Sequence, residues 1–539
     1  MQVRRLAAWV ALPLSAALAL AACGSGGGSG SSNPDGVISI GIGEPQHLLP
    51  GNTHETEGAQ VMAALYSPLV NFDEAGKPFE VAAESITSTD NKVWTIKLKD
   101  GKFHNGEAVD ADSFINSWNF TAYGPNAQDN SFFFDKFQGW ADLNPSDANV
   151  VPTQKTLSGL KKIDDKTIEV TLSAPFTEFR SLLGYTAFYP LPKAAFQDPA
   201  ATPLVLKTDF EQAPIGNGAF KIKGNWQHDQ QIEVERFADF TGEKPKVGGI
   251  LFRIYQNQGA QYADLLANNL DVVKTIPTES LATVQGDLGD RFRQSPSSSF
   301  QFLAFPTFDA RFSKPEVRKA ISMAINREEI VQQVFQGSQK AAYSFVSPVV
   351  AGYRDNTCGV NCEFKPAEAK AAYQAAGGPS SLNITYNADG GHKQWVDATC
   401  NQLKANLGVE CVGTPEAKFA DLLQKVEDKA EVGMFRLGWS FDYPSMENYL
   451  GPLYTTDGSS NYYGYSNPAF DTLVKEGAAA PTPDDSIKKY QEAEDILVQD
   501  MPVLPLRFGQ NNYGFSTKVQ NVELDLFSRV DLNKIEAVS

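Results

Sequence analysis

The chain has 539 residues, with 64 acidic side chains against 46 Lys and Arg and a formal net charge of −18. This acidity argues against nucleic acid or an anionic membrane surface as the main partner. The length exceeds that of one typical domain, so we expect two or more lobes. Five His spread over the chain are a poor supply of metal ligands, and we predict neither a metal site nor a cofactor.

The first 23 residues are typical of a targeting segment. Two arginines precede an apolar run, 6–20, that is too short to span a bilayer in the mature protein. Residues 20–23, Leu-Ala-Ala-Cys, resemble a lipobox, which implies a signal peptide and a lipidated, palmitate-carrying Cys23. The Gly- and Ser-rich stretch within 24–36 predicts a flexible tether. We therefore expect an extracytoplasmic lipoprotein on the outer face of the cell membrane; the alternative is an ordinary signal peptide with a chance Cys.

The other four cysteines should form disulfides outside the cytosol, with three possible connectivities. Cys358 and Cys362 flank a Gly-Val-Asn turn, and Cys400 on a predicted helix precedes Cys411 on a predicted strand. We favour these two local bridges. A zinc site is not favoured, because the first pair lacks C-x-x-C spacing and has no nearby His.

The remaining sequence alternates between strand-like and helix-like segments. Strands are predicted at 37–42, 79–84, 93–98 and 103–106, helices at 59–66 and at 113–121 after an Asp110 cap, and a two-strand hairpin at 160–172. Strands and helices then alternate over 247–273 and again over 382–438. This order indicates α/β lobes.

Many of these segments, in order and spacing, resemble the oligopeptide/dipeptide-binding lipoproteins of bacterial ABC importers, the cluster C solute-binding proteins. The matching segments span nearly the whole mature chain and are 65–69, 93–98, 103–106, 109–114, 160–172, 214–220, 317–330 with its Asn326-Arg327 ending, 464–471 and 501–506. The resemblance implies an α/β, two-lobed periplasmic-binding-protein type II fold with an extra small domain in the N-terminal half. The ligand would be enclosed as the lobes close about a hinge.

The resemblance also implies domain boundaries. Lobe I would comprise 37–67, 191–301 and 508–539, the extra small domain 68–190, and lobe II 302–507. The chain would cross between lobes near 300–305 and return near 506–509. Two short crossings are sufficient to absorb a closing rotation.

A single carboxylate, Asp442, lies among aromatic residues in the stretch 436–450. If it is buried, it needs a cation or several donors. The partner is Arg436 folding back, a distant residue, or the ammonium group of a ligand. In the family, the Asp of a Trp-x-x-Asp-Tyr motif holds the α-ammonium of a peptide, and 439–443 matches that motif. The alternative is that Asp442 caps the turn at Pro444.

Other site residues follow from the same resemblance. The backbone of Gly438 and Ser440 would pair with an extended peptide, which gives broad specificity. Arg436 and His392 match residues that meet the carboxylate end of short peptides, for which the planar donors of Arg are well suited. Ordinary alternatives are a surface Arg and a helix-capping His.

Aromatic side chains near the motif have two interpretations. Trp439, Phe441 and Tyr443 line side-chain pockets or belong to the core. Glu44, after the first strand, is a further expected ligand contact. A Trp that the family carries near Ala417 is absent here, so the shape of the pocket should differ.

These observations predict a substrate-binding lipoprotein, and not an enzyme, that captures short peptides with a free amino terminus and delivers them to an ABC permease. It would be a monomer, attached to the membrane only by its lipid. The alternatives on the same scaffold are a nickel chelate, haem, glutathione or an oligosaccharide, and a secreted hydrolase is more distant. No G-x-S-x-G or P-loop motif occurs, and His54-Glu55 lacks the second His of H-E-x-x-H.

Overall fold

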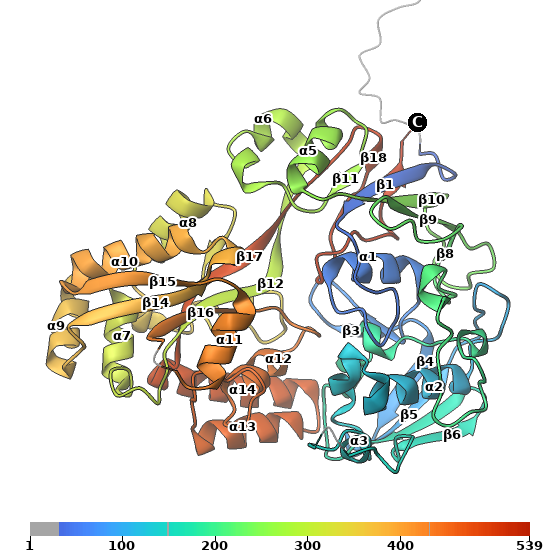
Figure 1. The fold of residues 1–539 in the computed structure, drawn as a ribbon, viewed down its shortest axis with the longest axis horizontal. Coiled ribbons are helices and arrows are strands. Elements are labelled where there is room, and N and C mark those ends of the chain that lie inside the picture. The colour runs from blue at the N-terminus through green and yellow to red at the C-terminus, as the bar shows by residue number, and fades with distance from the viewer. Residues whose placement is uncertain (1–31, 148–149, 431, 539) are drawn as a thin grey trace, which may run out of the picture.

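One mixed sheet runs through both halves of the molecule (Figure 1). The computed structural model describes residues 32–147, 150–430 and 432–538; Cys23 and most of the predicted tether lie outside them. Within the described residues the sheet has eleven strands, in the spatial order β15 (Glu410–Glu416), β14 (Ser381–Asn387), β16 (Met434–Trp439), β12 (Phe292–Ala304), β17 (Val503–Phe515), β11 (Val272–Val273), β1 (Val37–Ile42), β10 (Gly249–Ile254), β9 (Gln231–Arg236) and β8 (Phe220–Ile222), with β13 (Lys340–Ala341) paired to β17.

The long antiparallel strands β12 and β17 connect the two halves (Figure 1). The segments expected to cross between lobes, 300–305 and 506–509, overlap these strands. The ladder between β12 and β17 changes register twice, between Pro296 and Phe300 and between Gln301 and Phe302. The connection is therefore a hydrogen-bonded ribbon with two irregularities.

In the first half, β1 is buried from Ile38 to Ile42 and pairs in parallel with β10 and β11. Helix α1 (Thr56–Leu65) packs beside it and begins three residues earlier than the predicted 59–66, because the Glu55 carboxylate accepts from the Gly58 N–H at 2.7 Å. The remaining helices of this half are α5 (Gln258–Leu266) and α6 (Val284–Leu288). Burial of the aliphatic side chains of β1 and β10 makes this core.

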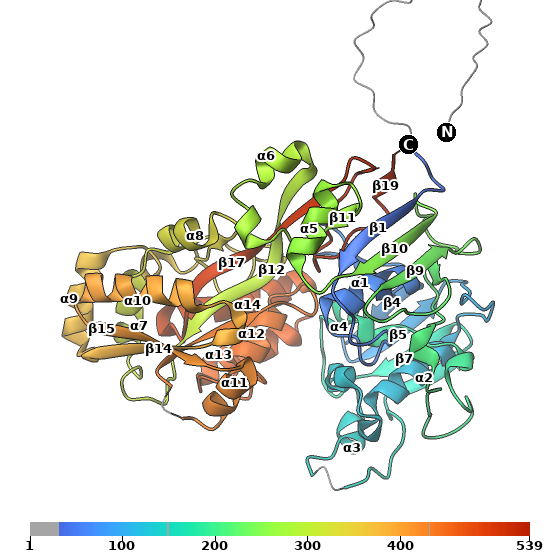
Figure 2. The same cartoon turned by 45° about the horizontal axis from the view of Figure 1, so that its top comes forward.

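A separate antiparallel sheet forms the extra small domain expected from the resemblance (Figure 2). Its strands are β4 (Ala83–Ser88), β5 (Val93–Leu98), β7 (Thr167–Thr171) and β6 (Leu160–Asp164), and its neighbours are α2 (Ala111–Ala122), α3 (Trp140–Leu143), α4 (Phe179–Leu182) and the hairpin β2 (Val70–Phe72) and β3 (Pro78–Glu80). The cap of α2 is Asp110, as predicted, and its carboxylate accepts from the Ser113 N–H.

Two predicted strands of this region differ from the structure. The stretch 103–106 is a tight turn, because the Gly106 N–H donates to the Phe103 carbonyl at 2.9 Å and Gly106 has a φ of +89°. The stretch 79–84 contains the end of β3 and the beginning of β4, separated by residues 81–82.

The second half sandwiches its part of the sheet between two layers of helices. One layer contains α7 (Pro315–Met323), α8 (Arg327–Phe335), α9 (Pro366–Ala376) and α10 (Lys393–Leu407), and the other contains α11 (Phe419–Glu427), α12 (Glu447–Tyr454), α13 (Pro468–Ala478) and α14 (Pro483–Asp500). The family-like segment 317–330 covers most of α7 and the start of α8, and Asn326 caps α8 by accepting from the Glu329 N–H.

Both predicted disulfides are present in this half and confirm the local pairing. Cys358 pairs with Cys362 and Cys400 with Cys411, with Cα separations of 5.6 Å and 5.0 Å. The part of the chain that the structure describes contains no helix long and apolar enough to cross a membrane.

The extra small domain also touches the second half directly. The Thr177 N–H donates to the Ala478 carbonyl at 2.8 Å, and the Asn91 side chain donates to the Ala480 carbonyl at 2.7 Å. These bonds join the small domain to the end of α13. Asp442 belongs to the second half, as do Ala478 and Ala480.

Candidate ligand-binding site

Strand β16 leaves one edge open where the motif begins. On one side it pairs with β12 as far as Trp439, opposite Phe300. On the other side its ladder with β14 ends at Phe435. No described strand pairs with Gly438 and Trp439 on that edge, so their backbone groups are available to an added strand.

Gly438 is covered by the side chain of its neighbour on β12. A Cβ built at this position would lie 2.3 Å from the side-chain nitrogen of Gln301, which covers the glycine. The Gln301 amide donates to the Ser299 hydroxyl at 3.1 Å, which holds it there. The absence of a side chain therefore keeps the strand surface flat beside the cavity described next.

A cavity of about 660 Å³ lies against this edge of the sheet. Its size is typical of a site for a small ligand. Five of the predicted site residues line it, namely His392, Arg436, Gly438, Trp439 and Ser440, together with Ser299, Gln301, Phe335, Gln339, Asn387, Gly390, Gly391, Trp395, Phe419 and Arg507. Residues from β16, β12, β17 and the start of α10 thus meet at one site.

Arg436 is held from two sides. Its Nη1 donates to the Asn387 side-chain oxygen at 3.1 Å, and its guanidinium lies 5.0 Å from the centre of the Phe419 ring. Phe419 begins α11, near the position where the family Trp was expected and is absent. A smaller aromatic ring therefore supports the cation at this place.

His392 is buried immediately before α10, and one of its ring nitrogens has a defined role. The Trp395 indole N–H donates to His392 Nδ1 at 3.1 Å. Because an indole can only donate, Nδ1 is the acceptor and the proton of a neutral ring is on Nε2. The histidine is therefore fixed in orientation by Trp395 and is not the side-chain cap of the helix.

Arg507 is a lining residue that the sequence reasoning missed. Its guanidinium lies over the rings of Phe335 and Trp395, 4.5 Å and 4.9 Å from the ring centres. Burial and the like charge of Arg436 both lower the pKa of the Arg507 guanidinium. The available sequence signal was an arginine directly after the buried run 503–506 of β17.

Asp442 lies outside the lining of this cavity, beside the extra small domain. Its carboxylate accepts from the Asn448 side chain at 3.2 Å, and its N–H donates to the Asn448 oxygen at 2.8 Å. Burial and, to a smaller extent, the nearby charge of Glu447 raise the pKa of Asp442 to about 6, against the lowering effect of the Asn448 hydrogen bond. Among the described residues no cation pairs with Asp442, so Arg436 is not its partner.

Three other residues that we predicted to contact the ligand instead contact other residues of the protein. Phe441 is buried in T-shaped contact with Phe527, and the hydroxyl of buried Tyr443 donates to Glu447. Glu44 accepts from His228 Nδ1 at 2.7 Å. None of the three lines the cavity.

Metal binding finds no support in the described ranges. His47 pairs with Glu211 at 3.1 Å and His54 lies 3.6 Å from Asp129. Within residues 32–147, 150–430 and 432–538, no group of three or more His, Cys, Asp and Glu side chains is placed to hold a metal ion.

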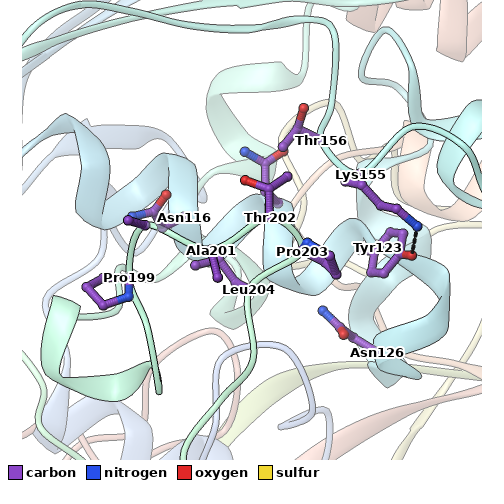
Figure 3. A pocket seen from close by; sticks show the side chains of 12 residues that line it. Asn116, Tyr123, Asn126, Lys155, Thr156, Pro199, Ala201, Thr202, Pro203 and Leu204 are labelled. Carbon is purple, nitrogen blue, oxygen red and sulfur yellow. Dashed lines mark hydrogen bonds between the residues drawn. The ribbon is translucent and has the colours of Figure 1, made fainter.

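A smaller cavity of about 190 Å³ lies beside α2 in the extra small domain (Figure 3). Figure 3 shows the Lys155 ammonium donating to the Tyr123 hydroxyl at one end of it, a bond of 2.6 Å. Asn116, Asn126 and the loop 199–204 complete its lining. None of the predicted site residues lies there.

The family of bacterial extracellular solute-binding proteins, family 5 Middle, matches residues 77–461. This is well over half of the chain, and the chain belongs to this family. Membership confirms the resemblance seen in the sequence and the expectation of an extracellular binding protein that is not an enzyme.

Individual relatives are distant but matched along most of their length. The oligopeptide-binding protein OppA of Bacillus subtilis is 26% identical over 484 residues, covering 86% of each chain. The periplasmic murein peptide-binding protein MppA of Escherichia coli is 25% identical over 475 residues, again covering 86% of each. The glutathione-binding protein GsiB of Escherichia coli is 25% identical over 474 residues, covering 85% of this chain and 86% of GsiB.

Solved structures show the same fold. MppA in its unliganded open form aligns with a TM-score of 0.81 at 22% identity, covering 95% of this chain and 99% of MppA. Haemophilus influenzae OppA in complex with RPPGFSPFR aligns with a TM-score of 0.73 at 22% identity, covering 94% and 100%. The predicted fold class, with its extra small antiparallel sheet, is therefore confirmed.

Proposed function

We propose that the protein captures short peptides with a free amino terminus and delivers them to an ABC permease. The observation that carries this proposal is Asp442, a partly buried carboxylate with no described cation. A ligand ammonium would supply the missing charge through charge-assisted hydrogen bonds. The peptide-binding names of OppA and MppA point to the same ligand class.

The open edge of β16 supports the same ligand. An extended peptide added there would form main-chain hydrogen bonds with Gly438 and Ser440, which do not depend on peptide sequence. Its carboxylate end would meet Arg436 and His392, both of which line the cavity. Trp439 would contact a peptide side chain.

Calorimetric titration with a peptide pool and its N-acetylated counterpart tests the proposal, after mass spectrometry of whatever co-purifies. We expect heat of binding for the free peptides and a large loss for the acetylated ones. Equal binding of both pools would contradict a role for the ligand ammonium. Glutathione belongs in the same titration, because GsiB is named for binding it.

Membrane attachment through Cys23 is the second part of the proposal. The lipobox-like residues 20–23 support it. Labelled palmitate should be incorporated into the native protein and not into a Cys23→Ser variant, which should appear in the medium or the soluble extracytoplasmic fraction. A labelled or membrane-bound C23S protein would argue against the anchor.

A further inference from the structure

Arg507 differs from the other buried arginines in how its donors are used. Three arginines are buried among the described residues, with exposed fractions of 3% for Arg318, 2% for Arg327 and 4% for Arg507. Arg327 donates to the carbonyls of Pro505 at 2.7 Å and Cys362 at 2.9 Å, and Arg318 likewise donates to backbone carbonyls. In the described part of the chain, Nε and Nη1 of Arg507 have no acceptor.

A buried cation without acceptors is unfavourable by several kcal/mol relative to a paired one. The rings of Phe335 and Trp395 lie close to the Arg507 guanidinium and offset part of this penalty. They supply no hydrogen-bond acceptor to Nε and Nη1. The structure thus holds a rigid, dry set of N–H donors against the cavity.

A β-bulge directs Arg507 toward the cavity. On β12, Gln301 pairs with Arg507 while the adjacent Phe302 pairs with Pro505, so Leu506 is the extra residue. Such a bulge places two successive side chains on the same side of the strand. Gln301 in turn pairs with Gly438, so Arg507, Gln301 and Gly438 form one row across three strands on the cavity face.

We propose that Arg507 is a second anion-binding group beside Arg436, and that the preferred ligand brings two carboxylates to this end of the cavity. The two carboxylates would be the C-terminal carboxylate of a peptide and the acidic side chain of its last residue. This inference deepens the proposed function and depends on it for the identity of the ligand. Arg436 and Arg507 repel each other because both are positively charged. Two carboxylates can neutralise both guanidinium groups, whereas one carboxylate neutralises them only partly.

The test compares peptides of one sequence that end in Glu or in Gln, both with a free C-terminal carboxylate. The native protein should bind the Glu peptide about tenfold more tightly, the range of one charge-assisted hydrogen bond. In an Arg507→Gln variant the preference for the Glu peptide over the Gln peptide should fall below about threefold. An equal preference in both proteins, or none in the native protein, would overturn the proposal.

Arg327→Gln is the matched control, because it also removes a buried guanidinium. Its donors are used by the protein, so this variant should have a lower Tm and an unchanged preference for Glu. R507Q should keep or raise the Tm, since no protein acceptor is lost. If R507Q does not fold, Arg507→Lys keeps the charge without the planar donors and should show a reduced preference.

A titration with glutarate separates this inference from the proposed function. Glutarate is a dianion without an ammonium group, and its binding can be followed by calorimetry. Millimolar binding that R507Q abolishes, with no binding of any peptide, would reject the proposed function and leave the anion site in place. Peptide binding with no glutarate binding and no Glu preference would reject the anion site alone.

Discussion

Asp442 and Arg507 are both desolvated charged groups, but one is acidic and the other is basic. The surroundings of each keep the charged group away from water without a described counter-charge. Burial raises the pKa of the carboxyl and lowers the pKa of the guanidinium, which are the two signs of one desolvation effect. Stability alone does not explain such groups, and a ligand that carries an ammonium and carboxylates would pair with both.

The two regions differ in how the protein supports the charge. Asp442 keeps one side-chain partner, Asn448, which lies six residues away on α12. Arg507 is held by ring faces from α8 and α10 and by a bulge in β17. The side-chain partner of Asp442 is thus close in the sequence, whereas the residues that hold Arg507 are far from it in the sequence.

The largest expected effect is the loss of the acidic charge. Asp442→Asn should weaken binding of a free peptide by about 2–5 kcal/mol, because an enclosed ammonium would lose its counter-charge. Calorimetry measures this loss, and N-acetylated peptide should bind both proteins equally. A change of less than about threefold would favour a turn-capping role.

Removal of the first basic group should have the next largest effect. Arg436→Gln should weaken binding of peptides with a free carboxylate by about 2–3 kcal/mol, the range for hydrogen bonds to charged groups. C-terminally amidated peptides should show almost no difference between R436Q and the native protein. An equal loss for amidated peptides would indicate that Arg436 only shapes the cavity through Asn387 and Phe419.

The free energy of unfolding of the ligand-free protein should depend on pH, because the Asp442 carboxyl is desolvated. The pKa of Asp442 is higher in the folded protein, about 6, than its ordinary value of 3.8. Its stabilising contribution is therefore complete below about pH 4 and is lost as the pH rises through about 6. We expect about 1–2 kcal/mol after allowing for partial exposure.

Urea denaturation of native and D442N proteins between pH 4 and 7 measures the contribution of Asp442 to the free energy of unfolding. Raised pKa values of Glu178 and Glu447 give the same trend in both proteins, so the difference between the two reports Asp442 together with its interaction with Glu447. D442N should be the more stable protein at pH 7. Lower stability of D442N there would identify Asp442 as a structural cap.

The smallest effect is expected where recognition would use the backbone. Ser440→Ala should change peptide affinity by no more than about 0.5 kcal/mol, because only its main chain would pair with the ligand. The measurement is a titration with several unrelated peptides. A large loss for one peptide would show that the hydroxyl reads a particular side chain.

Sequence reasoning reached the features that depend on neighbouring residues. The Asp110 cap, the pairing of Cys400 with Cys411 and the motif around Asp442 all involve short separations along the chain. Arg507 could not be placed in the same way, because its stacking partners come from helices more than 100 residues earlier and its direction depends on a bulge. The strand expected at 103–106 was wrong because Gly106 adopts a positive φ and closes a turn.

The paired strands β12 and β17 have a mechanical consequence for the whole molecule. A Gly- and Ser-rich linker would let two bodies tumble almost freely, whereas a hydrogen-bonded ribbon resists torsion and has a resting angle. Its weakest point lies where the ladder is interrupted after Pro296, opposite Gly509, whose Cβ would lie 2.4 Å from the Ser297 hydroxyl oxygen. Arg507 lies two residues from that interruption. A force on its guanidinium would therefore act close to the place where β12 and β17 connect the two halves.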